Sequence, residues 1–204
     1  MEEQIKIRHE LQFGVPIYEA DLPGFDERKQ ELIDHFLTLR ETSAGAAISN
    51  QGGWHSAGDL HRSEEPCVKS LLQLLARTGI QCIKHTRQIP EAVRIAMVSS
   101  WVMINEAGDW NVPHAHFPCD WSGVCYININ DKEAKVVKGN RDGDILFFDP
   151  LPLGPKYQRP PTISKTPADG KVFVFPSYLV HMVAPHFDEG MRIAVSFNFN
   201  LVAR

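Results

Sequence analysis

Apolar residues in the first part of the chain recur at the spacing of an α-helix. Two stripes carry this pattern: Leu32, Ile33, Phe36 and Leu37, and then Val68, Leu71, Leu72 and Leu75. Asp26 is expected to cap the first helix, and Pro66 to stand in the first turn of the second. Gly79 is expected to end the second helix, because glycine is common just past a helix. Residues 49–59, between the stripes, have the composition of a loop.

After residue 93 the pattern changes to short blocks rich in β-branched and aromatic residues, which is typical of strands. The segments expected to form strands are 94–105, 121–129, 134–138, 144–149, 171–175 and 192–202. The last one alternates strictly, with Arg192, Ala194, Ser196, Asn198 and Asn200 on one face and apolar residues on the other. This polar face indicates either a solvated surface or the lining of a ligand cavity in a barrel-like sheet.

Helical segments followed by many short strands predict an α+β, mainly β protein with a closed or sandwiched sheet. No repeat or low-complexity linker divides the chain, so a single domain over residues 1–204 is expected. Its helical support would come from residues 1–90 and its barrel from residues 91–204.

Composition narrows the function classes. The net charge of −4 and pI of about 6.1 argue against nucleic acid or an anionic membrane as the main partner. No apolar run is long enough to span a bilayer, and the first residues lack the features of a secretory or transit peptide. A cytoplasmic protein is expected, in which the cysteines, without any CxxC spacing, are free and buried thiols.

The segment NVPHAHFPCDW points to metal chemistry. Its two histidines, His114 and His116, are separated by one residue and would point to the same face of a strand. A third, His181, lies in FPSYLVHMVAP, just after a predicted strand. Three neutral imidazoles suit Fe, Zn, Cu or Ni, and three protein ligands with open positions are typical of a catalytic site. Asp120 is an alternative ligand, or an acceptor that orients an imidazole.

Several segments together resemble a small branch of the 2-oxoglutarate/Fe(II)-dependent oxygenases that is related to phage-encoded proteins. They are SNQGGWHS, WVMIN, GDWNVPHAHFP, WSGVCYI, FFDP, FPSYLVHMVAP and RIAVSFN. The resemblance implies a double-stranded β-helix, or jelly-roll. It also implies a dioxygenase that uses O₂ and Fe(II) to hydroxylate a substrate while 2-oxoglutarate is decarboxylated to succinate.

The resemblance also implies roles for individual residues. His114, His116 and His181 would hold Fe(II), although most relatives have Asp or Glu where His116 stands. Arg192, on the polar face of the last strand, would bind the distal carboxylate of 2-oxoglutarate, a task suited to a bidentate guanidinium. Further cosubstrate contacts would come from Ser196, Tyr126 and Asn105. The other partner would be a small-molecule or peptide substrate, and a homodimer is possible.

Two other interpretations remain open at this stage. Gly108 with the histidine pair and Asp120, and Gly170 with Pro176 and His181, also resemble the two cupin motifs. That resemblance implies a metal-dependent dioxygenase or isomerase that does not use 2-oxoglutarate. The proline-rich segment 149–161 could instead be a polyproline ligand in a non-enzymatic protein.

The same segment is equally compatible with a stiff loop or with a lid over the site. In a lid, Lys156, Tyr157 and Arg159 would be available to an anionic group of the substrate.

Overall fold

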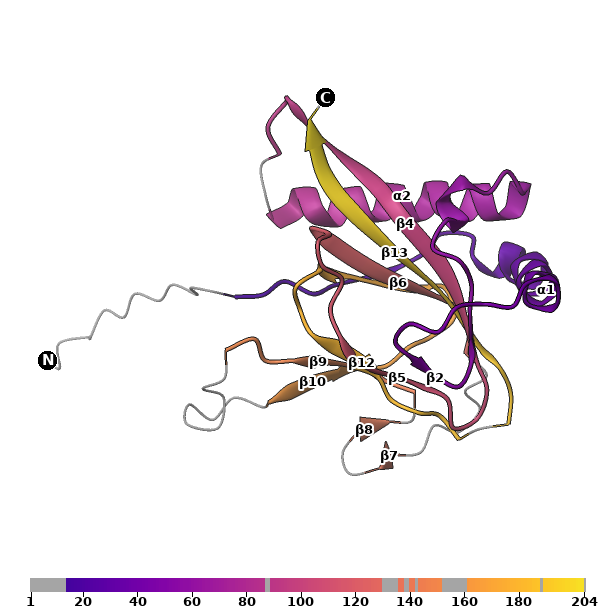
Figure 1. Ribbon diagram of the computed structural model, residues 1–204. Coiled ribbons are helices and arrows are strands. Elements are labelled where there is room, and N and C mark those ends of the chain that lie inside the picture. The colour runs from indigo at the N-terminus through magenta and orange to yellow at the C-terminus, as the bar shows by residue number, and fades with distance from the viewer. Residues whose placement is uncertain are drawn as a thin grey trace, which may run out of the picture.

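The computed structural model describes residues 14–86, 89–129, 136–137, 140–141, 143–151, 161–187 and 189–203. Two antiparallel β-sheets face each other, and the helices cover the outer side of the larger sheet (Figure 1). The helices are α1 (Asp26–Thr42), α2 (Pro66–Thr86) and the single-turn 3₁₀-helix η1 (Leu60–Arg62). Within the described residues, no helix is long and apolar enough to cross a membrane.

The larger sheet has six strands and contains the longest ladder of the molecule. Its order is β1 (Tyr18–Asp21), β11 (Lys171–Pro176), β6 (Trp121–Asn128), β13 (Arg192–Ala203), β4 (Val93–Asn105) and β3 (Trp54–His55). β13 pairs along its whole length with β4, from Arg192 opposite Asn105 to Ala203 opposite Val93. This long central pair fixes the positions of side chains that face the second sheet.

The second sheet has five shorter strands. Its order is β10 (Thr162–Lys165), β9 (Ile145–Phe148), β12 (His181–Val183), β5 (Trp110–His114) and β2 (Asn50–Gln51). A separate hairpin is formed by β7 (Val136–Val137) and β8 (Asn140–Arg141). The two facing sheets are what a double-stranded β-helix requires, and they confirm the mainly β fold with helical support.

The larger sheet has an apolar cluster on each face. Toward the helices, Leu32 of α1 and Leu71 of α2 belong to one cluster with Val195 and Phe197 of β13. Between the two sheets lies a smaller cluster, which includes Phe175 of β11. The apolar face of β13 therefore packs under the helices, as its alternation predicts, and its other face is turned toward the second sheet.

The helices depart from expectation at two residues. Asp26 does not cap α1; the helix begins at Asp26, with Phe25 at the cap position and no side-chain capping bond. Gly79 does not end α2, which continues to Thr86. A Cβ at Gly79 would lie 2.3 Å from Cε2 of Phe199, so this glycine lets the helix approach β13 closely.

The predicted strands are found with small shifts at their ends, but the assignment of residues 1–90 to helices and loops is incomplete. β1 joins the larger sheet beside β11, and segment 49–59 holds β2 and β3, which join opposite sheets. These strands are short and polar, so no hydrophobic alternation marks them. Of the predicted strand 134–138, only Val136–Val137 lies in the described residues. All four cysteines are free, as expected, but only Cys67 and Cys125 are buried, whereas Cys82 and Cys119 are half-buried.

Candidate metal centre and cosubstrate pocket

Three imidazoles meet between the two sheets. His114 ends β5 and His181 begins β12, and the two are direct partners in the ladder. His116 lies just beyond β5, where its backbone N–H donates a hydrogen bond to the Ser177 carbonyl at 2.9 Å. One ligand nitrogen from each ring lies within 4.8 Å of the others, and the ring centroids are 4.4–5.0 Å apart.

Backbone carbonyls select the tautomer of two rings. Nδ1 of His114 lies 2.6 Å from the Val112 oxygen, and Nδ1 of His181 lies 3.0 Å from the Leu179 oxygen. Because a carbonyl only accepts hydrogen bonds, each Nδ1 must carry the proton, which leaves the lone pair on Nε2. Two of the three rings are therefore prepared to bind a metal through Nε2.

Burial keeps all three rings neutral. It lowers the pKa of His114, lowers that of His116 to about 4 and lowers that of His181 to about 3, and neighbouring imidazoles contribute less to the shifts of His116 and His181. Desolvation penalises the charged imidazolium, so the rings remain unprotonated near neutral pH. Neutral imidazoles are the form that binds transition metals.

An irregularity in β5 brings a further residue into the site. The β5–β12 ladder pairs His114 with His181 but Asn111 with Val183, so the register shifts by one residue between these pairs. Asn111 and His114 are three residues apart and would face opposite sides of a regular strand, yet both line the cavity. Nδ2 of Asn111 donates to the Ser49 hydroxyl at 3.2 Å.

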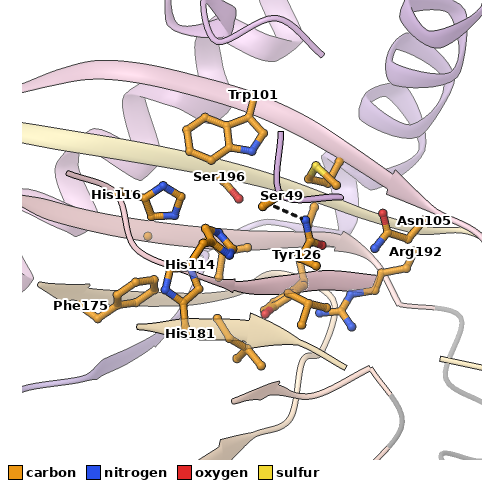
Figure 2. A pocket seen from close by; sticks show the side chains of 17 residues that line it. Ser49, Trp101, Asn105, His114, His116, Tyr126, Phe175, His181, Arg192 and Ser196 are labelled. Atoms are coloured by element: carbon orange, nitrogen blue, oxygen red, sulfur yellow. Dashed lines mark hydrogen bonds between the residues drawn. The ribbon is translucent and has the colours of Figure 1, made fainter. Parts of the chain in front are cut away.

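The cavity continues from the imidazoles to a buried guanidinium. Figure 2 shows the histidines at one end and Arg192 at the other, with Tyr126 between them. Arg192 is 6% exposed, donates to the Gly143 carbonyl, and has its Cζ 4.9 Å above the Tyr126 ring. Burial lowers its pKa, against the opposing effects of Tyr126 and Asp144, but a guanidinium stays charged at neutral pH.

Among the described residues, Arg192 forms no ion pair with a carboxylate. Two polar atoms in the same cavity also have no hydrogen-bond partner in the described part of the chain, the Tyr126 hydroxyl and Oδ1 of Asn105. Burial raises the pKa of Tyr126 to about 12, so the hydroxyl keeps its proton and can donate. Buried polar groups left without partners indicate that this end of the cavity receives a polar ligand.

The ladder between β4 and β13 sets the remaining polar lining. Arg192 faces Asn105, and Ser196 faces Trp101, and all four side chains line the cavity. The polar face of the last strand therefore lines a cavity at Arg192, Ala194 and Ser196 and is not a solvated surface there.

A family model described as "Putative 2OG-Fe(II) oxygenase" matches residues 99–198, which include the three histidines and Arg192. The chain belongs to the 2-oxoglutarate/Fe(II) oxygenase superfamily. The members of this superfamily are oxidoreductases. The match therefore favours an oxygenase over the cupin enzyme and the non-enzymatic protein that the sequence left open. Curated proteins gave no match.

Solved structures similar to the oxygenase show the same fold. A prolyl hydroxylase from Trichoplax adhaerens, in complex with a hypoxia inducible factor peptide, is 13% identical with a TM-score of 0.63, over 90% of this chain and 83% of that one. A Pseudomonas putida prolyl-4-hydroxylase is 14% identical with a TM-score of 0.63, over 91% and 92%. A Streptomyces hygroscopicus protein with nickel, 2-oxoglutarate and hygromycin B bound is 9% identical with a TM-score of 0.55, over 91% and 83%.

Asp120, the alternative ligand suggested by the sequence, lies outside the histidine cluster. Oδ2 of Asp120 accepts the Leu201 N–H at 2.7 Å, and the residue is not among those lining the cavity. Asp120 is also not one of the residues whose ligand atoms lie within 4.8 Å of one another in the histidine cluster. Cys119 also lies outside the cluster of ligand atoms.

Sequence reasoning missed one lining residue and one residue behind the lining. His55 of β3 does not line the cavity, but it is 3% exposed and stacks on Trp101, with ring centroids 5.4 Å apart. Trp101 in turn lies next to His116, again with ring centroids 5.4 Å apart. Ser49, beside Asn111, was missed as well. Both lie in segment 49–59, whose glycine-rich composition gives no periodic signal; only the resemblance of SNQGGWHS marked it. Residues 152–160 of the proline-rich segment, with Lys156, Tyr157 and Arg159, lie outside the described residues.

Proposed function

We propose that this protein is a 2-oxoglutarate- and Fe(II)-dependent dioxygenase that hydroxylates a small-molecule or peptide substrate. The observation that carries the proposal is one cavity with three neutral imidazoles at one end and a buried, charged guanidinium at the other. In the overall reaction, substrate, O₂ and 2-oxoglutarate would give hydroxylated substrate, succinate and CO₂.

The donor set fits Fe(II). His114, His116 and His181 would hold the ion through three neutral nitrogens, which leaves positions for other ligands. Fe(II) bound there supplies the site at which O₂ and the keto acid react. Among the described residues no carboxylate belongs to this cluster, so the protein adds no negative charge to the metal. The keto acid's own carboxylate would provide that charge.

The opposite end fits the distal carboxylate of 2-oxoglutarate. Arg192 offers a guanidinium with no carboxylate paired to it among the described residues, and the O–H of Tyr126 finds no acceptor among them. Ser196 lines the same cavity nearer the histidines, opposite Trp101, and would contact the cosubstrate there (Figure 2). Bidentate pairing with a guanidinium is stronger in a buried site than at a surface, because water does not compete.

The chain itself orients and shields the reacting groups. Ring positions are fixed by the carbonyl contacts of His114 and His181, so the ligands need little reorganisation on binding. Phe175 packs edge-on against His181, with centroids 4.7 Å apart, and limits water on that side. Trp101, next to His116, forms part of the cavity wall.

A single-turnover assay tests the proposal without knowledge of the substrate. Wild-type protein with Fe(II), O₂ and 2-oxoglutarate should form succinate slowly, because these components suffice for uncoupled decarboxylation. His181→Ala should lose iron binding and succinate formation while keeping its circular dichroism spectrum. His85→Gln, an exposed histidine of α2, should behave as wild type. Succinate formation that is independent of iron, or undiminished in His181→Ala, would contradict the proposal.

A further inference from the structure

A second group of metal-binding side chains lies outside the catalytic cavity, between the helices. His35 comes from α1, Glu65 immediately precedes α2, and Cys67 lies in its first turn. One ligand atom from each of the three lies within 4.8 Å of the others, the same limit that contains the catalytic histidines. Cys67 is 8% exposed and His35 is half-buried, so the group is partly shielded from water.

Other partners do not occupy these side chains. Among the described residues, no hydrogen bond or ion pair is found for the His35 ring nitrogens or the Glu65 carboxylate. The lysine of this turn, Lys69, pairs with Glu64 at 2.7 Å and not with Glu65. A ring nitrogen, a carboxylate and a thiol thus converge, and among the described residues no ion pair engages the carboxylate.

A fourth oxygen is available from α1. Glu31 lies one helical turn before His35, which places both on the same face of the helix. The Glu31 carboxylate is not among the ligand atoms that already lie within 4.8 Å of one another, so a side-chain rotation would bring it to the metal. Negative charge concentrated around a thiol and an imidazole favours a divalent cation.

We propose that His35, Glu65 and Cys67, with Glu31 as fourth ligand, bind a zinc-class divalent cation that joins α1 to α2. The mixed nitrogen, sulfur and oxygen set suits Zn²⁺, which accepts Cys, His and carboxylate ligands in tetrahedral sites. On binding, the metal–sulfur bond replaces the S–H bond of Cys67, and the proton leaves to solvent. Two ligands from each helical segment make this a closed, structural site, separate from the catalytic centre.

Cobalt(II) provides a probe that distinguishes the two sites. A cysteine ligand gives Co(II) a thiolate charge-transfer band in the near ultraviolet, and three imidazoles do not. Metal-free full-length wild type should develop this band, saturating at one equivalent of the thiolate-bound ion, and Zn²⁺ should remove it. The band should persist in His181→Ala, which lacks a ligand of the catalytic site. This test of the second site is therefore independent of the proposed oxygenase function.

Matched cysteine variants locate the sulfur ligand. Cys67→Ser and His35→Gln, on different helices, should each lose the band and bind one equivalent of Zn²⁺ fewer than wild type. Cys82→Ser, further along α2, and Cys119→Ser, near the catalytic histidines, should keep it. Zn²⁺ should raise the melting temperature of His181→Ala but not of Cys67→Ser/His181→Ala. No band in wild type, a band only in large excess of metal, or a band that survives Cys67→Ser would overturn the proposal.

Discussion

At the scale of single residues, the metal centre depends on imidazoles that burial keeps neutral and that backbone hydrogen bonds orient. The carbonyls of Val112 and Leu179 fix two rings, and the contact between the His116 N–H and Ser177 holds the third residue in place. Each of these contacts comes from the main chain, so they would survive substitution of neighbouring side chains. The burial that makes the rings good ligands also has a measurable cost in the metal-free protein.

That cost predicts how stability depends on pH. His181 has a folded-state pKa of about 3, below the value of about 6.5 in the unfolded chain. As pH falls below 6.5, the unfolded state takes up a proton that the folded state does not. The free energy of unfolding should then fall by about 1.4 kcal/mol per pH unit for each such ring.

Urea unfolding of the metal-free protein between pH 7.5 and 5 measures this slope. His181→Gln should show a shallower slope than wild type, whereas His85→Gln should match wild type. Equal slopes in His181→Gln and wild type would show that this ring is not held neutral by burial.

Arg192 predicts a selective defect in cosubstrate binding. Arg192→Met removes the charge-assisted contact, worth about 1.5–3 kcal/mol, and should raise the Kd for 2-oxoglutarate about 10–100-fold. The Kd for Fe(II) alone should change little, because the guanidinium lies at the other end of the cavity from the histidines (Figure 2). Arg94→Ala, exposed on β4, is the control. Isothermal titration calorimetry with Fe(II) and with 2-oxoglutarate measures both constants. An unchanged Kd for 2-oxoglutarate in Arg192→Met would refute the role of Arg192 in cosubstrate binding.

At the scale of elements, the close approach of α2 to β13 predicts a large effect of a small change. Gly79→Ala should destabilise the protein by about 1–3 kcal/mol, because the added methyl would overlap Phe199. The effect should be seen although alanine favours helices more than glycine does. Gly58→Ala, where a Cβ meets nothing within 4 Å, is the matched control. If chemical denaturation finds Gly79→Ala as stable as wild type, the contact is not tight in solution.

Elements with a regular hydrophobic pattern could be predicted from the sequence. The long strands β4 and β13 and both helices follow from their periodicity, and the alternation of β13 separates its polar face from its apolar face. The histidine cluster was predicted from a short motif and a distant residue, and the resemblance supplied Arg192. Two local features could not be predicted. A register shift in β5 turns Asn111 toward the cavity, and Gly79 lies inside α2 because it lets the helix approach Phe199 closely.

Short polar strands escaped prediction for a different reason. β2 and β3 each have two residues, and their pairing with β5 and β4 depends on backbone hydrogen bonds that any sequence can form. The placement of His55 beside Trp101 follows from that pairing. Periodicity within a segment cannot reveal a contact set by its partner strand.

At the scale of the whole molecule, the larger sheet separates two tasks. Its outer face packs on α1 and α2 through the main apolar cluster (Figure 1). Its inner face, with the second sheet, encloses the cavity. Stability is thus supplied mainly on one side of the sheet, and polar groups can be gathered on the other. The arrangement permits a buried guanidinium and three imidazoles without dividing the main core.

The most direct test of this arrangement is the visible absorption spectrum of the anaerobic protein with Fe(II) and 2-oxoglutarate. Simultaneous binding of both in one cavity predicts a weak metal-to-ligand charge-transfer band that requires both components and saturates at one of each per chain. His116→Ala should lose the band at stoichiometric iron. A protein that binds Fe(II) at these histidines yet shows no band at saturating 2-oxoglutarate would contradict the account.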